Sequence, residues 1–417
     1  MKNSILFLEP KGTMLEVIRA AKGREFTVFA LVSDYSLLDA LPSPYASARQ
    51  CIDELLVVKD WNDLPTILSV AQALHASCPV KGVFFGLDLC AVAGAALREY
   101  FDLPTPTPGT MELIVDKHKL RTKLYKAGLS KLRSVPGVEA DRWTEWKIGR
   151  PAYFKPVHGA FSLYVTRCGS LADLQRAKTA WLDGMGSMPK FLSDFIYAKA
   201  EYHLEEEFEG ELMSVEGIST RGEYLCLGLT SRIMYSKNPA VEMGSCFPYP
   251  HPLADAIIDF TRAMHAGLGF TDGPSHVEIM VNAAGEMEVI DFNPRFIGAD
   301  VLQSINFAYG LKVEELLLDW CVGHKPVLVP REANYSCIQY VLPPHELLLE
   351  SLDFPQMPEV KFSTSFVKPG MQVSGADRQI DYLGCYLTVM PTYESAMARS
   401  KELRHLVTIN TTIQGAF

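Results

Sequence analysis

Hydrophobic positions in the first 110 residues fall into short apolar runs separated by stretches with helical spacing. The helical stretches are Leu64–His75 and Ala91–Phe101, and the apolar runs are Ile5–Leu8, Phe26–Val32, Leu55–Val58 and Val83–Phe85. Strands that alternate with helices predict βαβ units around a parallel sheet. The loop EPKGT after the first run has a single glycine, so a tight turn is the better interpretation. It lacks GxGxxG, which argues against a Rossmann oxidoreductase.

The segment PTPTPG, residues 104–109, interrupts this rhythm. Its prolines predict a connector rather than a helix, and we place a domain boundary here. A helix is predicted directly after it, with Asp116 as N-cap and Gly128 just beyond its end.

The middle of the chain changes to an α+β pattern with antiparallel hairpins. A helix over 253–267 has an apolar stripe, and another is expected around 298–322. Residues 323–417 mix turns, strands and a helix. We therefore expect an N-terminal βαβ domain (1–110), a central α+β domain (111–322) and a C-terminal α+β subdomain (323–417). The strands predicted before residue 253 are AYFKPV (152–157), LYVTR (163–167), 199–206, 213–220 and 223–232.

Composition narrows the class of protein. The chain has 417 residues, 48% of them hydrophobic, and a net charge of −10, so it can bury large cores and is a poor partner for nucleic acid. Its nine cysteines include no CxxC pair, which favours a reducing cytoplasm over a disulfide framework. The N-terminus is predicted to be a strand rather than a signal peptide, and no apolar run is long enough to span a membrane.

Two strands, SHVEIMV and MEVIDFNPR, carry the strongest chemical signal. If Asn282 faces Met287 across a four-residue loop, Glu278 lies opposite Asp291; with a two-residue loop the two acids lie diagonally. Both registers place the carboxylates on one face, because side chains alternate along a strand.

Facing carboxylates repel each other unless a cation lies between them. Mg²⁺ prefers hard oxygen ligands and keeps substrate phosphates in its shell, so a Mg²⁺ site is predicted, with Mn²⁺ as a substitute. Asn293 adds a neutral oxygen on the same face. Arg295 continues that face, where it could stabilise a phosphoryl group.

Two lysines and an acidic segment suggest a nucleotide near this hairpin. Lys155 lies in an apolar strand, where its charge needs a partner such as phosphate, although a lysine at a strand edge is the ordinary alternative. The small-residue loop HGAFS (158–162) that follows is suited to backbone contact with phosphate oxygens. Lys117 begins a helix, a position that attracts anions. The segment LEEEFEGE (204–211) has acids around one aromatic residue; by itself it would be read as a solvated face.

Taken in order, these pieces resemble the ATP-grasp superfamily, and within it the L-amino-acid ligases. The motifs that carry the resemblance are DKHKLRTKLYKAGL, AYFKPV, LEEEFEGELMSVEG, GPSHVEIM and EVIDFNPRFIG. It implies an ATP-grasp fold, with 1–110 as the preceding domain and about 150–220 as a mobile lid. Asp291 stands where a glutamate is usual. The segment LEEEFEGE, which in this superfamily would form the hinge that binds adenine, is one residue short before Gly210. Either Glu205 or Glu206 can therefore be its first residue.

The resemblance also implies roles for individual residues. Lys117 and Lys155 would hold ATP phosphates, with Lys155 and Arg295 acting in catalysis. The remaining implied roles are an adenine hinge (Glu206, Glu207, Phe208), a ribose contact (Glu211), metal ligands (Glu278, Asp291, Asn293) and substrate contacts (Arg232, Glu242, Gly298).

The implied reaction activates a carboxylate as an acyl phosphate and couples it to an amine, with release of ADP and phosphate. The expected partners are small molecules, with no nucleic acid and no membrane, and a homodimer is the default assembly. Two alternatives stay open. One is an ATP-grasp carboxylase or ligase with another acceptor, and the other is a nucleotide-binding protein without catalysis.

Overall fold

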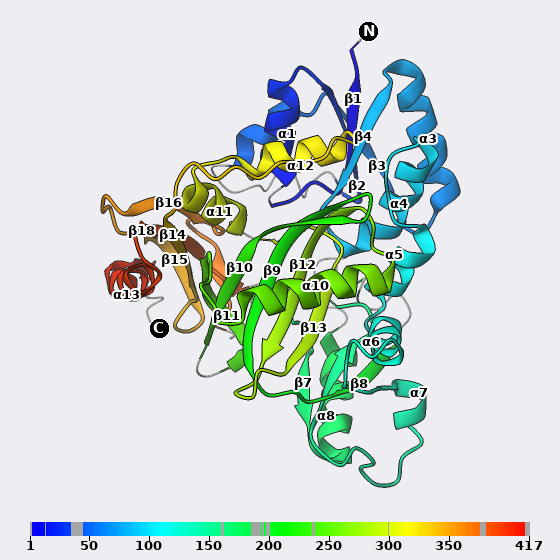
Figure 1. Cartoon of the computed structure of the whole chain (residues 1–417). Helices are drawn as coiled ribbons and strands as arrows, with labels where there is room; N and C mark the ends of the chain where they lie inside the picture. Colours follow the sequence, from blue (N-terminus) through cyan, green and yellow to red (C-terminus); the bar gives the residue numbers. More distant parts are fainter. Residues whose placement is uncertain are drawn as a thin grey trace.

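The computed structural model describes residues 2–12, 14–34, 45–159, 162–184, 193, 196, 201–235, 238–298, 300–375 and 381–412. A parallel sheet, a large central sheet and a smaller antiparallel sheet follow one another through the molecule, and the C-terminal stretch adds strands to the central sheet and forms a further three-stranded sheet (Figure 1).

The N-terminal part is the predicted βαβ sheet. Its strands lie in the order β3-β2-β1-β4 and all pair in parallel. Strands β1, β2 and β4 are buried on both faces, as is usual for parallel strands, whereas the edge strand β3 is partly exposed. The elements are β1 (Ser4–Leu8), α1 (Met14–Gly23), β2 (Thr27–Val32), η1 (Tyr45–Cys51), β3 (Glu54–Val57), α3 (Leu64–Ser77), β4 (Val80–Phe85), η2 (Asp88–Cys90) and α4 (Ala91–Tyr100).

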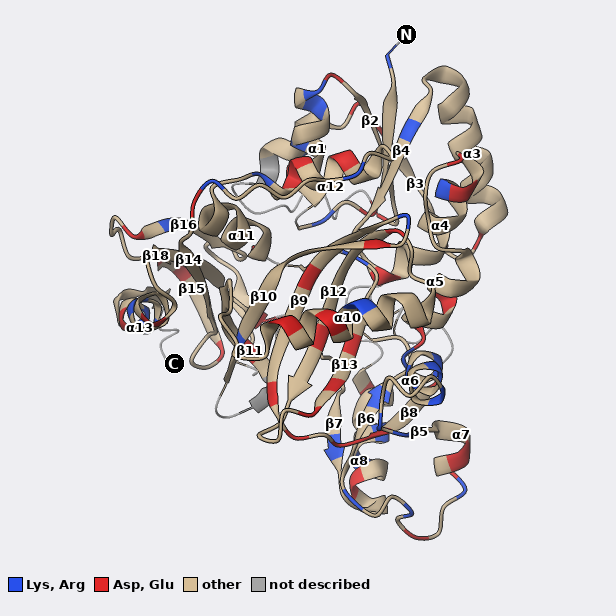
Figure 2. Ribbon diagram, viewed as in Figure 1, with Lys and Arg blue, Asp and Glu red and all other residues tan. Residues whose placement is uncertain are grey.

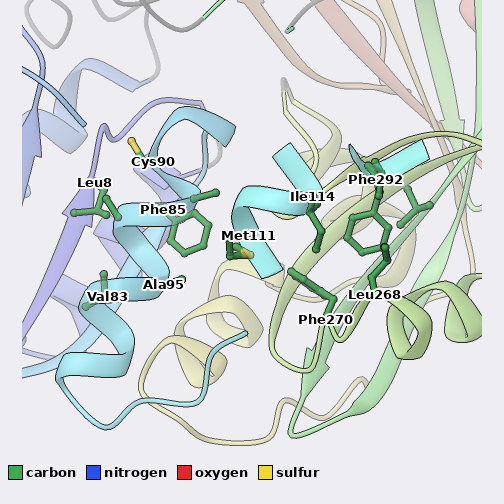
Figure 3. Packing of buried hydrophobic residues seen from close by; sticks show 14 of the residues in the cluster. Leu8, Val83, Phe85, Cys90, Ala95, Met111, Ile114, Leu268, Phe270 and Phe292 are labelled. Atoms are coloured by element: carbon green, nitrogen blue, oxygen red, sulfur yellow. The ribbon is translucent and has the colours of Figure 1, made fainter. Parts of the chain in front are cut away.

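The proline segment does not exclude a helix along its whole length. Helix α5 (Pro108–Val115) begins inside it, so the prediction of a connector through residue 109 was wrong. Pro108 occupies a first-turn position, where its missing N–H costs nothing, and the Thr107 side chain caps the helix. Met111 and Ile114 of α5 lie between the apolar cores of the N-terminal and central sheets and join them (Figure 3).

Helix α6 (Lys117–Lys126) has the predicted ends. The Asp116 side chain accepts a hydrogen bond from the backbone N–H of Lys119 at 2.9 Å, and Gly128 follows with a φ of +71°. The side chain of Lys117 is thereby placed at the N-terminus of this helix.

The smaller antiparallel sheet has the order β5-β8-β6-β7 and is called here the β5–β8 sheet. The strand predicted at 163–167 was misplaced, because Ser162 and Tyr164 adopt positive φ values in a turn and β7 starts later. Residues 160–161 of the predicted phosphate loop and 199–200 of the next strand lie outside the described residues. The elements are β5 (Ser134–Pro136), α7 (Gly137–Ala140), β6 (Ala152–Pro156), β7 (Thr166–Cys168), α8 (Leu171–Asp183) and β8 (Tyr202–Glu206).

The central sheet has eight strands in the order β13-β12-β9-β10-β11-β14-β18-β16. Strands from the C-terminal stretch therefore continue the sheet that contains the metal hairpin, and the boundary at 322 stays a prediction. The strands are β9 (Glu211–Thr220), β10 (Glu223–Tyr235), β11 (Asn238–Phe247), β12 (Gly273–Val281), β13 (Met287–Asn293), β14 (Tyr335–Val341), β16 (Val360–Ser365) and β18 (Gly384–Met390).

Helices pack around this sheet. The predicted helix over 253–267 is α10, but the helix predicted over 298–322 is two helices, because Gly310 ends the first with a φ of +59°. Among the described residues, no helix has the length and apolar character to cross a membrane. The remaining elements are α10 (Ala254–Leu268), α11 (Val301–Tyr309), α12 (Val313–Cys321), β15 (Leu347–Asp353), β17 (Gln372–Val373), α13 (Tyr393–Leu403), η5 (Arg404–Leu406) and β19 (Thr408–Thr412).

Candidate active site

The β12–β13 hairpin pairs Glu278 with Asp291, but by a route that neither predicted register contained. Glu278 lies directly opposite Asp291, as the register with the four-residue loop predicts, but near the turn Val281 rather than Asn282 faces Met287. A β-bulge between Glu278 and Ile279 then shifts the register by one residue. Without it, Asp291 would lie opposite Val277 and on the other face of the sheet, because a one-residue slip exchanges the faces. The bulge therefore brings the two carboxylates together.

Polar side chains continue across the neighbouring strands on the same face. Register pairs Glu278 with Ser214 and His276 with Glu216 of β9, and pairs His276 with Asn293 of β13. The alternate residues, such as Val277 and Ile279, belong to the apolar core with α10. Acidic positions on β9, β12 and β13 and basic positions on α6 and the β5–β8 sheet are visible in Figure 2.

Glu278 is held beside two basic groups. Its Oε1 atom lies 3.4 Å from Nε2 of His276 and 3.7 Å from Nη2 of Arg232. Burial raises the pKa of Glu278, but His276, Arg232 and Lys117 outweigh it and lower the pKa to about 2. Glu278 is therefore an anion at neutral pH, as a metal ligand must be.

Lys117 and Asp291 form a hydrogen-bonded ion pair. Burial lowers the pKa of Lys117, but Asp291, Asp88 and Glu278 raise it above its ordinary value, so the lysine is charged. A Cβ atom on Gly159 would lie 3.5 Å from Cε of Lys117, so the predicted phosphate loop approaches this lysine. The structure thus brings together a predicted phosphate ligand and a predicted metal ligand.

Arg295 reaches between two parts of the molecule. Its Nη2 donates to Oδ1 of Asn293 at 3.1 Å, and its Nε lies 3.2 Å from the carboxylate of Asp88. Sequence reasoning missed Asp88. The available signal was its position directly after β4, because ligand sites in open α/β sheets form at the carboxyl ends of strands.

Lys155 has a protein partner. Its Nζ donates to Oε1 of Glu205 at 2.5 Å, and Nε of Arg121 donates to the other oxygen at 2.9 Å. Arg121 also donates to Glu288 of β13 at 2.7 Å. Burial raises the pKa of Glu205, but Arg121, Lys155 and His203 lower it to about 2. Lys155 is therefore part of a buried ionic network that links the β5–β8 sheet to the hairpin.

The predicted hinge residues lie at the end of β8, of which Glu206 is the last residue. Glu206 is buried and accepts hydrogen bonds from the backbone N–H of Arg133 at 3.0 Å and from Arg150 at 3.1 Å. Glu207 pairs with Arg167 through both carboxylate oxygens, and Phe208 is half-buried.

Glu211 lies apart from the two lysines in its contacts. Its Oε1 accepts a hydrogen bond from the hydroxyl of Tyr249 at 2.6 Å, and it lines a cavity of about 530 Å³ with Gly210, His251 and Leu253. The carboxylate pair does not line this cavity, so geometry, rather than cavity size, locates the candidate site.

Arg232 lies on β10, within the strand predicted over 223–232, and Glu242 lies on β11, which was not predicted. Nη1 of Arg232 contacts both oxygens of Glu242 at 2.8 and 3.0 Å. Gly298 is exposed and follows β13 without regular structure. The structure therefore joins Arg232 and Glu242 to the metal hairpin through Glu278.

The donor set fits a hard divalent cation. Two carboxylates face each other, and the Asn293 amide oxygen lies on the same face. Within the described residues there is no group of three or more His, Cys, Asp or Glu side chains arranged to hold a metal. Two carboxylates with an amide suit Mg²⁺, which completes its shell with phosphate and water.

Comparison with known proteins agrees with this geometry. Residues 148–303 match the family model described as an ATP-grasp domain. The crystal structure of an L-amino acid ligase from Bacillus licheniformis superposes with a TM-score of 0.81 at 19% identity and covers 99% of both chains. The chain therefore contains an ATP-grasp domain and has the ATP-grasp fold, as predicted.

The predicted resemblance to L-amino acid ligases is also confirmed. The alanine–anticapsin ligase of Bacillus subtilis (strain 168) is 26% identical over 274 residues, which cover 58% of this chain and 57% of that protein. The L-arginine-specific L-amino acid ligase of Bacillus subtilis is 25% identical over 296 residues and 70% of each chain. The chain thus spans little more than half the length of the first of these relatives.

Proposed function

We propose that the protein is an ATP-dependent ligase that joins a carboxylate, most simply that of an amino acid, to an amine. The observation that carries the proposal is the convergence of Glu278, Asp291, Lys117 and Arg295 from the hairpin and α6 on one face of the sheet. The names of the relatives supply the substrate class. A small-molecule ligase in the cytoplasm also agrees with the composition.

In the proposed reaction a carboxylate oxygen of the first substrate attacks the γ-phosphorus of ATP. The bond from that phosphorus to the bridging oxygen breaks, which gives an acyl phosphate and ADP. The amine nitrogen then attacks the acyl carbon, loses a proton, and phosphate leaves with the C–O bond electrons. Bound Mg²⁺ would be held by Glu278, Asp291 and Asn293 and would neutralise phosphate charge.

The chain's own cations would position the anionic reactants. Lys117 would exchange Asp291 for phosphate, and Lys155 would reach phosphate from the β5–β8 sheet. Arg295 would stabilise charge on the transferred phosphoryl group. Backbone groups at Glu206, Glu207 and Phe208 would bind adenine and Glu211 the ribose, while Gly298 would lie beside the substrate.

A lid over about 150–220 would exclude water from the acyl phosphate. Support comes from the separate hydrophobic core of the β5–β8 sheet, which includes Phe154, Trp181 and Leu204. A part with its own core can move as a unit.

The test is a matrix of amino-acid pairs incubated with ATP and Mg²⁺, read by phosphate release and product mass. We expect release that requires both amino acids, with a product equal to their sum less one water. ADP release that requires bicarbonate instead would show a carboxylase. ATP binding without acceptor-dependent release would show a protein without this catalysis; either result would overturn the proposal. Gel filtration with light scattering tests the expected homodimer.

A further inference from the structure

A buried pair, Glu216 and His276, lies directly behind the carboxylate of Glu278. Glu216 has no exposed surface, and His276 is 5% exposed. Nδ1 of His276 lies 3.0 Å from Oε2 of Glu216, whose Oε1 also accepts hydrogen bonds from Ser214 at 2.6 Å and Thr230 at 3.2 Å. Three side chains therefore fix Glu216, and Glu216 fixes one side of the imidazole.

The other side of the imidazole faces the metal hairpin. Nε2 of His276 lies 3.4 Å from Glu278 and 3.1 Å from Arg232. Arg232 is itself held through Nη1 by Glu242 and stays 3.7 Å from Glu278. Both contacts to Glu278 fall on Oε1, so Oε2 stays available to a cation.

Arg232 and a bound metal ion would compete for the carboxylate of Glu278. Arg232 is buried, and a direct bidentate pair with Glu278 would draw that carboxylate away from Asp291. Glu242 holds Nη1 and His276 lies beside Nη2, and in this arrangement Nη2 stays 3.7 Å from Glu278 rather than at hydrogen-bond distance. Side chains that orient metal ligands in this way typically change metal affinity or activity by about 10–100-fold.

We propose that His276, backed by Glu216, is a positioning residue that keeps Glu278 directed toward the metal. The inference rests on the proposed metal site but on no particular carboxylate or amine substrate. It assigns a role to two buried residues that the proposed reaction does not otherwise use.

Two substitutions at one position separate orientation from bulk. Glutamine in His276→Gln can place its amide near the former Nε2 and contact Glu278. Asparagine in His276→Asn can reach only the former Nδ1 and contact Glu216. His265→Gln is the matched control, because His265 is equally buried but lies on the α10 face, where it contacts Thr261 and Ser275.

The measurement is Mn²⁺ binding to the full chain by electron paramagnetic resonance, with a saturating non-hydrolysable ATP analogue. We expect His276→Asn to weaken Mn²⁺ about 10–100-fold, His276→Gln to weaken it less, and His265→Gln to leave it unchanged. Glu216→Gln should fall between, because the amide keeps an acceptor but loses the charge. Thermal unfolding of each variant without metal reports loss of fold separately.

Unchanged Mn²⁺ affinity in folded His276→Asn would overturn the inference, as would equal weakening in His265→Gln. The titration needs no acceptor or carboxylate, so a failed ligase assay does not decide it. A wild-type chain that binds the analogue but no Mn²⁺ would contradict the proposed function together with this inference.

Discussion

Lys117 and Lys155 were predicted to share one role, yet the structure places them in different surroundings. Lys117 and its partner Asp291 keep 18% and 22% of their side-chain surface exposed, whereas Lys155 and Glu205 keep 10% and 5%. The second pair is also joined by Arg121. A partly exposed pair can exchange its partner for a phosphate at modest cost, but a buried charge left without its partner is expensive. Lys117 on the hairpin side can therefore exchange its carboxylate partner for a phosphate, whereas the buried Lys155–Glu205 pair attaches the β5–β8 sheet to the hairpin.

The largest effect is expected at the two facing carboxylates of the β12–β13 hairpin. Glu278→Gln or Asp291→Asn should reduce ADP release about a thousandfold, because a neutral amide binds Mg²⁺ poorly. Both variants should stay folded but lose some stability, because Glu278→Gln removes the anion beside His276 and Arg232 and Asp291→Asn removes the anion beside Lys117. The matched control is Glu286→Gln in the turn of the same hairpin, where an exposed pair with Lys131 should be dispensable. ADP release at the wild-type rate in either carboxylate variant would show that the reaction does not need a metal ion held by that carboxylate.

Loss of the buried carboxylate that attaches the β5–β8 sheet to the hairpin should lower the free energy of unfolding. Glu205→Ala leaves Lys155 and Arg121 buried near each other without their shared anion, which should cost about 3 kcal/mol. Glu207→Ala should cost less than about 1 kcal/mol, because its partner Arg167 is 55% exposed and can be solvated when the carboxylate is removed. Denaturant unfolding followed by tryptophan fluorescence measures both, because Trp181 lies in the core of the β5–β8 sheet. Equal losses would show that burial does not distinguish the two pairs.

Acid should also lower the free energy of unfolding, through the buried His203 of the β5–β8 sheet. Burial lowers the pKa of His203 to about 3, against the attraction of Glu205. The folded protein then binds fewer protons at this site than the unfolded chain, so stability is present above about pH 6.5 and falls as the pH drops toward 3. His203→Asn should remove a slope of about 1.4 kcal/mol per pH unit between pH 6 and 5.

The measurement is the free energy of unfolding of wild type and His203→Asn across that window. Glu205, with its pKa lowered to about 2, contributes its own loss below about pH 4.5, so the two groups separate. A wild-type slope that persists in His203→Asn would assign the acid sensitivity to another group.

Local pattern predicted the elements better than it predicted their neighbours. The alternation around Glu278 and the caps at Asp116 and Gly128 depend on adjacent residues, and each was confirmed. The split between α11 and α12 was missed, although Gly310 was a visible break. Strand β11 was also missed, because its pairing with β14 depends on residues far along the chain.

The site shows the same limit. Alternation along the strands placed Glu278 and Asp291 on one face, but the β-bulge that achieves this was invisible in the sequence. The partner of Lys155 was predicted as phosphate, while Glu205 stood in the motif as a candidate for the hinge. Asp88 is 207 residues from Arg295, and no local pattern connects them. Long-range charge pairs were therefore the part that needed coordinates.

The smallest effect is expected at Asp88, the carboxylate partner of the third cation of the site, Arg295. Arg295 resembles Lys117 in that it is partly exposed and has a carboxylate partner, but its partner lies in η2, which follows strand β4 of the N-terminal part. Asp88→Asn keeps an oxygen acceptor and loses the charge, which should cost about 1 kcal/mol, or roughly fivefold in kcat. The KM for ATP should change little, because the hydrogen-bonded partner that Lys117 exchanges for phosphate is Asp291 and not Asp88. Steady-state kinetics with the pair found in the substrate matrix measures both constants. A rise in KM without a fall in kcat would place Asp88 with the nucleotide rather than with Arg295 and the transferred phosphoryl group.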